Sequence, residues 1–132
     1  EEKALKEDSE EQNNTDQEHH HLPLDDLHEE QLKLAIMSHL EYIRPYRSSW
    51  SEAIAVSLDP RELTYSLPSL FMLIDDLCHF ADIKTSRLDW YTERALMLYL
   101  YGTSELFLLS DSSENLQDTR NFLEQNIKYY KW

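Results

Sequence analysis

The segment over residues 95–109 is apolar around almost the whole circumference of a helix, which constrains the fold more than any other feature of this chain. A helix without a polar face must be surrounded, because water would otherwise meet its apolar side chains. Polar residues at 102–105 interrupt the segment, so it is too short to span a bilayer. We therefore expect a central bundle helix, or a helix lining an apolar cavity, over about residues 90–110.

Further helices are predicted where apolar residues recur three and four positions apart. The first starts near residue 25 and ends or bends at Pro45, and the second closes before Pro60. The third starts near Tyr65 or Pro68, and the fifth follows a break at 111–113. One glycine in 132 residues is too few for a turn-rich β fold. The fold class is therefore all-α, a bundle of about five helices with no strands.

Negative charge is concentrated in the first 32 residues, which hold 12 acidic and 2 basic side chains. Residues 1–24 also lack apolar periodicity, so they cannot bury enough surface to offset the entropy of ordering. We expect an acidic tail there, disordered or ordered against a basic partner, followed by one helical domain over residues 25–132. Excess acid repels phosphates, which argues against nucleic-acid binding.

Candidate metal ligands are few. His19, His20 and His21 are consecutive and cannot all face one ion, so we interpret them as a solvated run or a tag remnant. Asp76 and His79 lie three apart on a predicted helix, but di-metal bundles need a second acid-x-x-His motif, which the helical part lacks. We predict no metal site, and a solvent-edge acidic patch instead.

No catalytic residues are predicted either. Cys78 is the single cysteine, so no intramolecular disulfide can form and a reducing compartment is favoured. Its neighbour His79 points about 100° away around a helix, so the two do not form a nucleophile and base. With Gly102 as the only glycine, a glycine-rich phosphate loop is excluded. We expect neither an enzyme nor a bound cofactor.

Trp90 and Tyr91 stand at the start of the fourth predicted helix, where Asp89 is a plausible cap. Two large rings beside a polar link lie where a partner could cover them, which predicts a docking surface. The aromatic residues further along, such as Tyr99 and Phe107, either belong to the core or line a lipid tunnel. Periodicity alone does not separate these two interpretations.

Short motifs follow one another in order through the helical part of the chain. They are Ile43-Arg44-Pro45-Tyr46, Trp50-x-x-Ala53, Leu58-x-Pro60, residues 74–82, residues 89–95, residues 101–106, residues 111–113 and residues 118–124. This ordered set, over roughly residues 31–127, resembles the ubiquinone-biosynthesis lipid-binding family. The first residues are acidic, unlike a basic targeting peptide, so the localisation implied below comes from the resemblance alone.

The resemblance implies a fold similar to the TetR-type ligand-binding domain, with an apolar pocket for an isoprenoid lipid or quinone precursor. It implies a non-enzymatic protein of the mitochondrial matrix, peripheral to the inner membrane, that presents lipid to the di-iron demethoxyubiquinone hydroxylase; a homodimer is compatible with it. The implied partner-binding residues are Asp75, Leu77, Cys78, Trp90, Tyr91 and Arg94. The implied lipid-binding residues are Leu70, Phe71, Ile74, Leu96, Tyr99, Leu100 and Phe107.

The sequence also departs from the family pattern. Cys78 stands where a bulky aromatic residue is common, which would shrink the docking patch. An acidic segment stands in place of a helix-turn-helix-like region, and Trp132 precedes any membrane-binding amphipathic helix. The chain is then either a fragment or a core domain adapted to a larger assembly. The alternative function is accordingly a structural accessory subunit of a mitochondrial inner-membrane complex that reuses the fold without lipid transfer.

Overall fold

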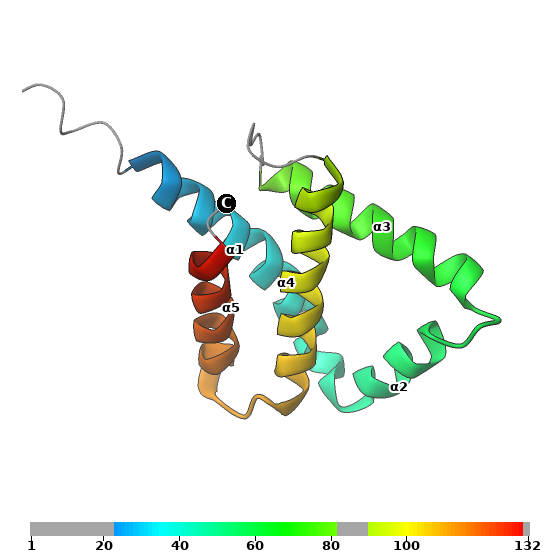
Figure 1. Ribbon diagram of the computed structural model, residues 1–132. Coiled ribbons are helices and arrows are strands. Elements are labelled where there is room, and N and C mark those ends of the chain that lie inside the picture. The colour runs from blue at the N-terminus through cyan, green and yellow to red at the C-terminus, as the bar shows by residue number, and fades with distance from the viewer. Residues whose placement is uncertain (1–22, 82–89, 131–132) are drawn as a thin grey trace, which may run out of the picture.

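A computed structural model describes residues 23–81 and 90–130 of the chain. Within these ranges there is no strand, and the all-α prediction is confirmed (Figure 1). The α-helices are α1 (Pro23–Ile43), α2 (Arg47–Ser57), α3 (Leu63–Phe80), α4 (Trp90–Ser110) and α5 (Gln117–Tyr130). Two 3₁₀ turns, η1 (Arg44–Tyr46) and η2 (Glu114–Leu116), precede α2 and α5.

The helix boundaries follow local sequence signals. Pro23 opens α1, a position where its missing N–H costs no hydrogen bond, so this helix begins slightly before the expected residue 25. Pro45 lies in η1, directly after the end of α1, as predicted. The tail predicted for residues 1–24, with its three histidines, falls almost entirely outside the described residues, as does Asp89.

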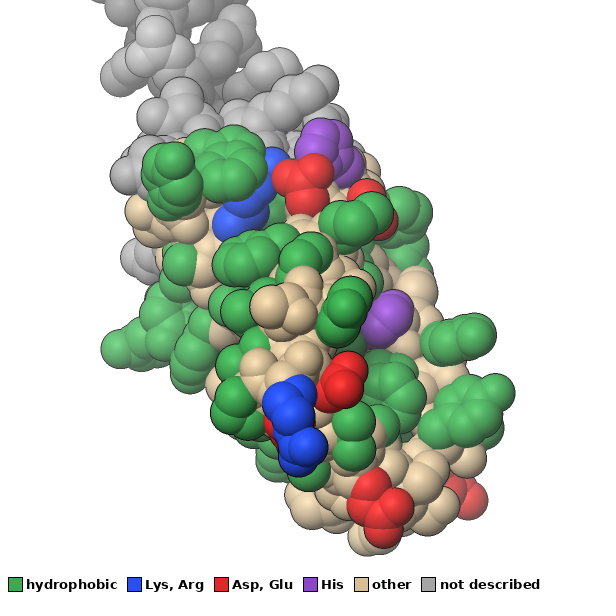
Figure 2. All heavy atoms as spheres, turned by 90° about the vertical axis from the view of Figure 1, so that its right-hand side faces the viewer, with side chains coloured by type: hydrophobic (Ala, Val, Ile, Leu, Met, Phe, Trp, Pro, Cys, Tyr) green, Lys and Arg blue, Asp and Glu red, His purple; other side chains and the backbone are tan. Residues whose placement is uncertain are grey.

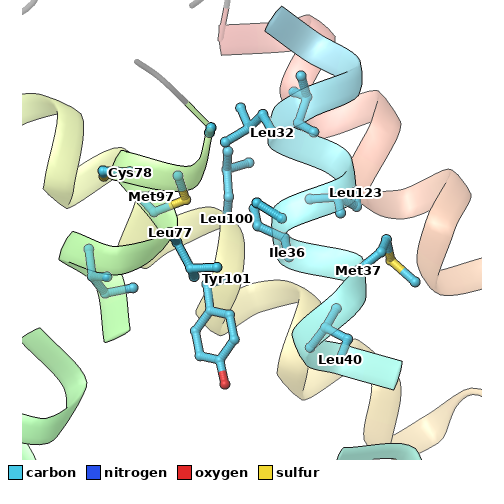
Figure 3. Packing of buried hydrophobic residues seen from close by; sticks show 14 of the residues in the cluster. Leu32, Ile36, Met37, Leu40, Leu77, Cys78, Met97, Leu100, Tyr101 and Leu123 are labelled. Carbon is cyan, nitrogen blue, oxygen red and sulfur yellow. The ribbon is translucent and has the colours of Figure 1, made fainter. Parts of the chain in front are cut away.

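Helices α1, α3, α4 and α5 pack together around one core, and α2 joins them through its contacts with α4 (Figure 1). Figure 3 shows the centre of this core, where α1, α3, α4 and α5 meet. Its fully or almost fully buried members include Leu32, Ile36, Leu40, Ile43, Ile74, Met97, Leu100, Leu108, Leu116, Leu123 and Ile127. No helix in residues 23–81 and 90–130 is both long and apolar enough to cross a membrane.

The predicted central helix, α4, does contact α1, α2, α3 and α5. It is nevertheless not surrounded on every side, which corrects the expectation from its apolar sequence. Met97, Leu100 and Leu108 face the core, whereas Leu98 and Leu106 on the opposite side are exposed. The helices that pack against α4 cover only part of its circumference, so an apolar strip remains in contact with solvent.

Candidate functional site: an aromatic patch and an apolar groove

Trp90 and Tyr91 form an exposed aromatic pair at the first turn of α4. Their side chains are 57% and 77% exposed. The two rings are nearly perpendicular, with centroids 5.0 Å apart. This edge-to-face arrangement is favourable for aromatic rings, and it presents a large apolar area to solvent. The pair lies on the surface, where the sequence predicted it.

Arg94, one turn further along α4, holds Trp90 in place. Its guanidinium carbon lies 4.0 Å from the centroid of the indole ring. The Nε and Nη2 atoms of the same side chain donate to Oδ1 of Asp75 on α3, at 3.0 and 2.5 Å. A cation over an indole face contributes about 0.5–2 kcal/mol. The contacts therefore link α3 to the exposed ring through one arginine.

The acidic residues of α3 form the expected solvent-edge patch. The second carboxylate oxygen of Asp75 lies 3.5 Å from Nδ1 of His79, which is exposed. Nδ1 is also 2.7 Å from the backbone carbonyl oxygen of Asp75. Asp76 is exposed to solvent. No group of three or more His, Cys, Asp or Glu side chains in the described part of the chain could hold a metal ion.

Leu77 and Cys78 do not belong to the surface, which corrects their assignment to the partner-binding patch. They are 7% and 5% exposed and point into the core beside Met97 and Leu100 (Figure 3). Burial raises the pKa of the Cys78 thiol to about 11, so the sulfur stays protonated and unreactive at neutral pH. We define the docking patch as Asp75, Trp90, Tyr91 and Arg94.

An apolar groove of about 520 Å³ lies between α2 and α3. Figure 2, viewed from the side of these two helices, shows hydrophobic side chains over much of the face that they present. The lining comprises Trp50, Ala53, Ile54, Val56, Ser57, Leu58, Glu62, Leu63, Tyr65, Ser66, Leu67, Ser69, Leu70, Leu73, Tyr101 and Glu105. Its volume is within the range of about 300–1,000 Å³ common for small-molecule sites.

Tyr101 and Glu105 of α4 supply the polar end of this groove. Oε1 of Glu105 accepts hydrogen bonds from Nε1 of Trp50 at 2.6 Å and from the Tyr101 hydroxyl at 3.3 Å. Burial, together with the nearby carboxylate, raises the pKa of Tyr101, so its hydroxyl keeps the proton that it donates. The three side chains thus join α2 to α4 through one carboxylate.

The predicted lipid-binding residues are dispersed rather than gathered at the groove. Leu70 alone of that set lines it. Ile74 and Leu100 are core residues, Phe71 is exposed and Leu96 is half-buried. Phe107 stacks on Phe122 and Tyr99 packs edge-on against Tyr130, both on α5. The helix over residues 90–110 was expected either at the centre of the bundle or lining an apolar cavity; the groove lies mainly between α2 and α3, and α4 contributes Tyr101 and Glu105 to it.

Several groove residues escaped the sequence analysis although a signal for them exists. Trp50, Ile54 and Leu58 follow one another at intervals of four along α2 and the turn after it. On α3, Leu63 and Leu67 lie seven and three residues before the predicted Leu70 and so share its helical face. Two such stripes on consecutive helices are typical of surfaces that face each other. Here the two stripes line an open groove instead of packing against each other as part of the core.

The fold and these two surfaces define a class of protein: an all-α domain that exposes an apolar groove and an aromatic patch. A family model described as COQ9 matches residues 63–131, just over half of the chain. The chain belongs to the COQ9 family.

Curated relatives match a longer part of the chain. "Probable ubiquinone biosynthesis protein coq9, mitochondrial" of Dictyostelium discoideum is 36% identical over 98 residues, which are 74% of this chain and 32% of the relative. "Ubiquinone biosynthesis protein COQ9, mitochondrial" is 38% identical over 96 residues in Xenopus tropicalis and 33% in Homo sapiens, in each case 73% of this chain and 30% of the relative. The matched part thus spans about a third of the length of these relatives.

Proposed function

We propose that this chain is a non-enzymatic lipid-binding accessory protein of ubiquinone biosynthesis. Its groove holds an isoprenoid quinone precursor, and its docking patch binds the di-iron demethoxyubiquinone hydroxylase that receives this lipid. The protein acts in the mitochondrial matrix, peripheral to the inner membrane. The names of the relatives, which assign them to ubiquinone biosynthesis and to mitochondria, support the pathway and the compartment.

The exposed indole of Trp90, held by Arg94 and Asp75, is the observation that carries the docking part of the proposal. Aromatic side chains near the centre of an interface commonly contribute about 2 kcal/mol or more each. A ring that is already held in place loses less conformational entropy on binding than a free one. The patch therefore has both the chemistry and the rigidity of a protein-binding surface.

The groove and the docking patch share helix α3. Leu73 lines the groove, and Asp75, two residues further along, belongs to the patch. Because successive residues of a helix are rotated by about 100°, Leu73 and Asp75 face different sides of α3. A lipid in the groove and a partner on the docking patch would thus contact the same helix from different sides, which supports a coupling of the two through α3.

Trp90→Lys tests the docking part. The substitution removes the ring, and it brings a second cation next to Arg94, so binding to the purified hydroxylase should weaken about 30-fold or more, the equivalent of about 2 kcal/mol. Surface plasmon resonance measures the affinity, and circular dichroism checks that the helix content is unchanged.

Tyr129→Lys is the matched control, because Tyr129 is an aromatic side chain of α5 with 78% exposure and lies outside the docking patch. It should bind the hydroxylase as the unsubstituted chain does. Equal affinity of the Trp90→Lys variant and the unsubstituted chain would refute the assignment of the patch.

A further inference from the structure

The hydrogen-bond donors of the groove are almost all engaged within the protein. The hydroxyls of Ser57, Ser66 and Ser69 donate to backbone carbonyl oxygens at 2.8, 2.6 and 3.0 Å. Trp50 and Tyr101 donate to Glu105. Each of these hydroxyls has a single proton to donate, so the serines and Tyr101 offer a ligand acceptor sites only, and the engaged indole N–H of Trp50 offers neither a free donor nor an acceptor. Tyr65, largely exposed to water, is the exception in the lining.

Glu105 is the acceptor best placed to meet a ligand. Both of its hydrogen bonds in the described part of the chain reach Oε1, and they leave Oε2 available. The side chain is half-buried at an apolar site, where a carboxylate gains most from a further donor. No Lys, Arg or His belongs to the lining residues named above, which include a second acid, Glu62. An anionic headgroup would therefore meet like charge without a compensating cation.

We propose that the groove selects amphiphiles whose polar end donates a hydroxyl proton to Glu105, as a phenol or a hydroquinone does. The apolar tail then lies along the leucines of α2 and α3. This inference rests on the proposed lipid-binding function and specifies its headgroup: an isoprenoid phenol or hydroquinone is bound, and an isoprenoid acid or phosphate is rejected.

Isothermal titration calorimetry of the full chain with three probes that share a geranyl tail tests the inference. The probes are geranyl hydroquinone, its dimethyl ether and geranoic acid. The ether keeps the ring but has no proton to donate, and the acid is anionic. Geranyl hydroquinone should bind about tenfold or more tighter than either of the others, as expected for a hydrogen bond to a charged group.

Glu105→Gln is the informative variant. The indole N–H of Trp50 can only donate, so it should orient the amide oxygen toward itself and place the amide nitrogen where Oε2 was. The amide nitrogen donates a hydrogen bond, and the oxygen atoms of both the hydroquinone and the ether can accept it. The affinity for geranyl hydroquinone should therefore exceed that for the ether by no more than about threefold in this variant. Glu52→Gln is the control, because Glu52 is exposed on α2 and lies outside the groove. It should bind geranyl hydroquinone in preference to the ether as strongly as the unsubstituted chain does.

Equal affinity of the unsubstituted chain for the hydroquinone and the ether overturns the headgroup inference and leaves lipid binding in place. Equal affinity for geranoic acid and the hydroquinone would also overturn the headgroup inference. A preference for the hydroquinone over the ether that is unchanged in the Glu105→Gln variant would overturn it as well. Absence of binding for all three probes overturns both the headgroup inference and the lipid-binding part of the proposed function.

Discussion

Asp111 shows how a single residue organises the connection between α4 and α5. Its Oδ1 accepts hydrogen bonds from the backbone N–H and the hydroxyl of Ser113, and its Oδ2 accepts from the same two groups of Thr119. Its backbone carbonyl accepts a hydrogen bond from Arg47 at the start of α2. Burial alone would raise the pKa of Asp111, but the donated hydrogen bonds lower it to about 2.

This pKa sets a pH dependence of stability. Because the folded-state pKa lies below the ordinary value of 3.8, the stabilisation is complete above about pH 4 and is lost as the pH falls through about 2. Asp111→Asn turns an amide N–H₂ toward two donors, so it should lower the free energy of unfolding by about 1–3 kcal/mol near neutral pH. Urea denaturation between about pH 6 and pH 3 should show this difference shrinking at the acidic end.

Asp76→Asn is the control, since Asp76 is exposed and its side chain makes no hydrogen bond or ion pair within the described part of the chain. Its unfolding free energy should stay within about 0.5 kcal/mol of the unsubstituted chain at every pH. A deficit of the Asp111→Asn variant that is the same at every pH would exclude the carboxylate as its cause.

At the scale of elements, α4 has two different faces. Its buried face packs against the other helices, and its exposed face includes Leu98, Gly102 and Leu106. A Cβ atom built on Gly102 would have no neighbour within 4 Å. A glycine inside a helix is tolerated where a neighbouring element or a ligand approaches its backbone. Among the described residues, no other element comes this close to Gly102, and open space lies next to it.

Gly102→Ala should therefore stabilise the chain by about 0.5–1 kcal/mol, because alanine loses less conformational entropy in a helix and meets no obstacle here. Thermal and urea unfolding at two protein concentrations measure the effect. A loss of stability that grows with protein concentration would contradict this expectation, since it would mean that a second copy packs closely against this face.

At the scale of the whole molecule, helix α3 contributes to both surfaces: residues between Leu63 and Leu73 line the groove, and Asp75, nearer the C-terminal end of the helix, belongs to the docking patch. The same architecture could serve a structural subunit that binds no lipid. Native mass spectrometry of the purified chain separates the two roles. Co-purified isoprenoid lipid, released by organic solvent, is expected for lipid presentation, and its consistent absence is expected for a structural role.

Two alanine-to-tryptophan substitutions on α2, one inside the groove and one outside it, form a matched pair for this measurement. Ala53 lines the groove, whereas Ala55 is exposed on the same helix and outside the lining. Ala53→Trp should strongly reduce the co-purified lipid because the added indole fills part of the groove, and Ala55→Trp should leave the amount of lipid unchanged. Lipid retained by both variants would place the binding site elsewhere in the molecule.

Local sequence signals suffice to predict the helices and most of the positions where they break. Apolar residues three and four apart, Pro45 after the first helix and the polar step at 111–113 are local signals, and each acts within a few residues of the chain. Trp90 and Tyr91 were also predicted at the surface, because a helix start beside a polar link is seldom covered. Pro68 is an exception: it lies inside α3, which begins five residues earlier at Leu63.

Which apolar faces are covered depends on how the helices pack, and local sequence signals do not predict it. Leu77 and Cys78 became core because α1 and α4 pack on that side of α3, and the groove opened because α2 and α3 do not close on each other. Burial depends on neighbours that are distant in sequence, and helical periodicity carries no information about which neighbour arrives. For the same reason, no local signal predicts the hydrogen bond between Glu105 of α4 and Trp50 of α2 in the groove.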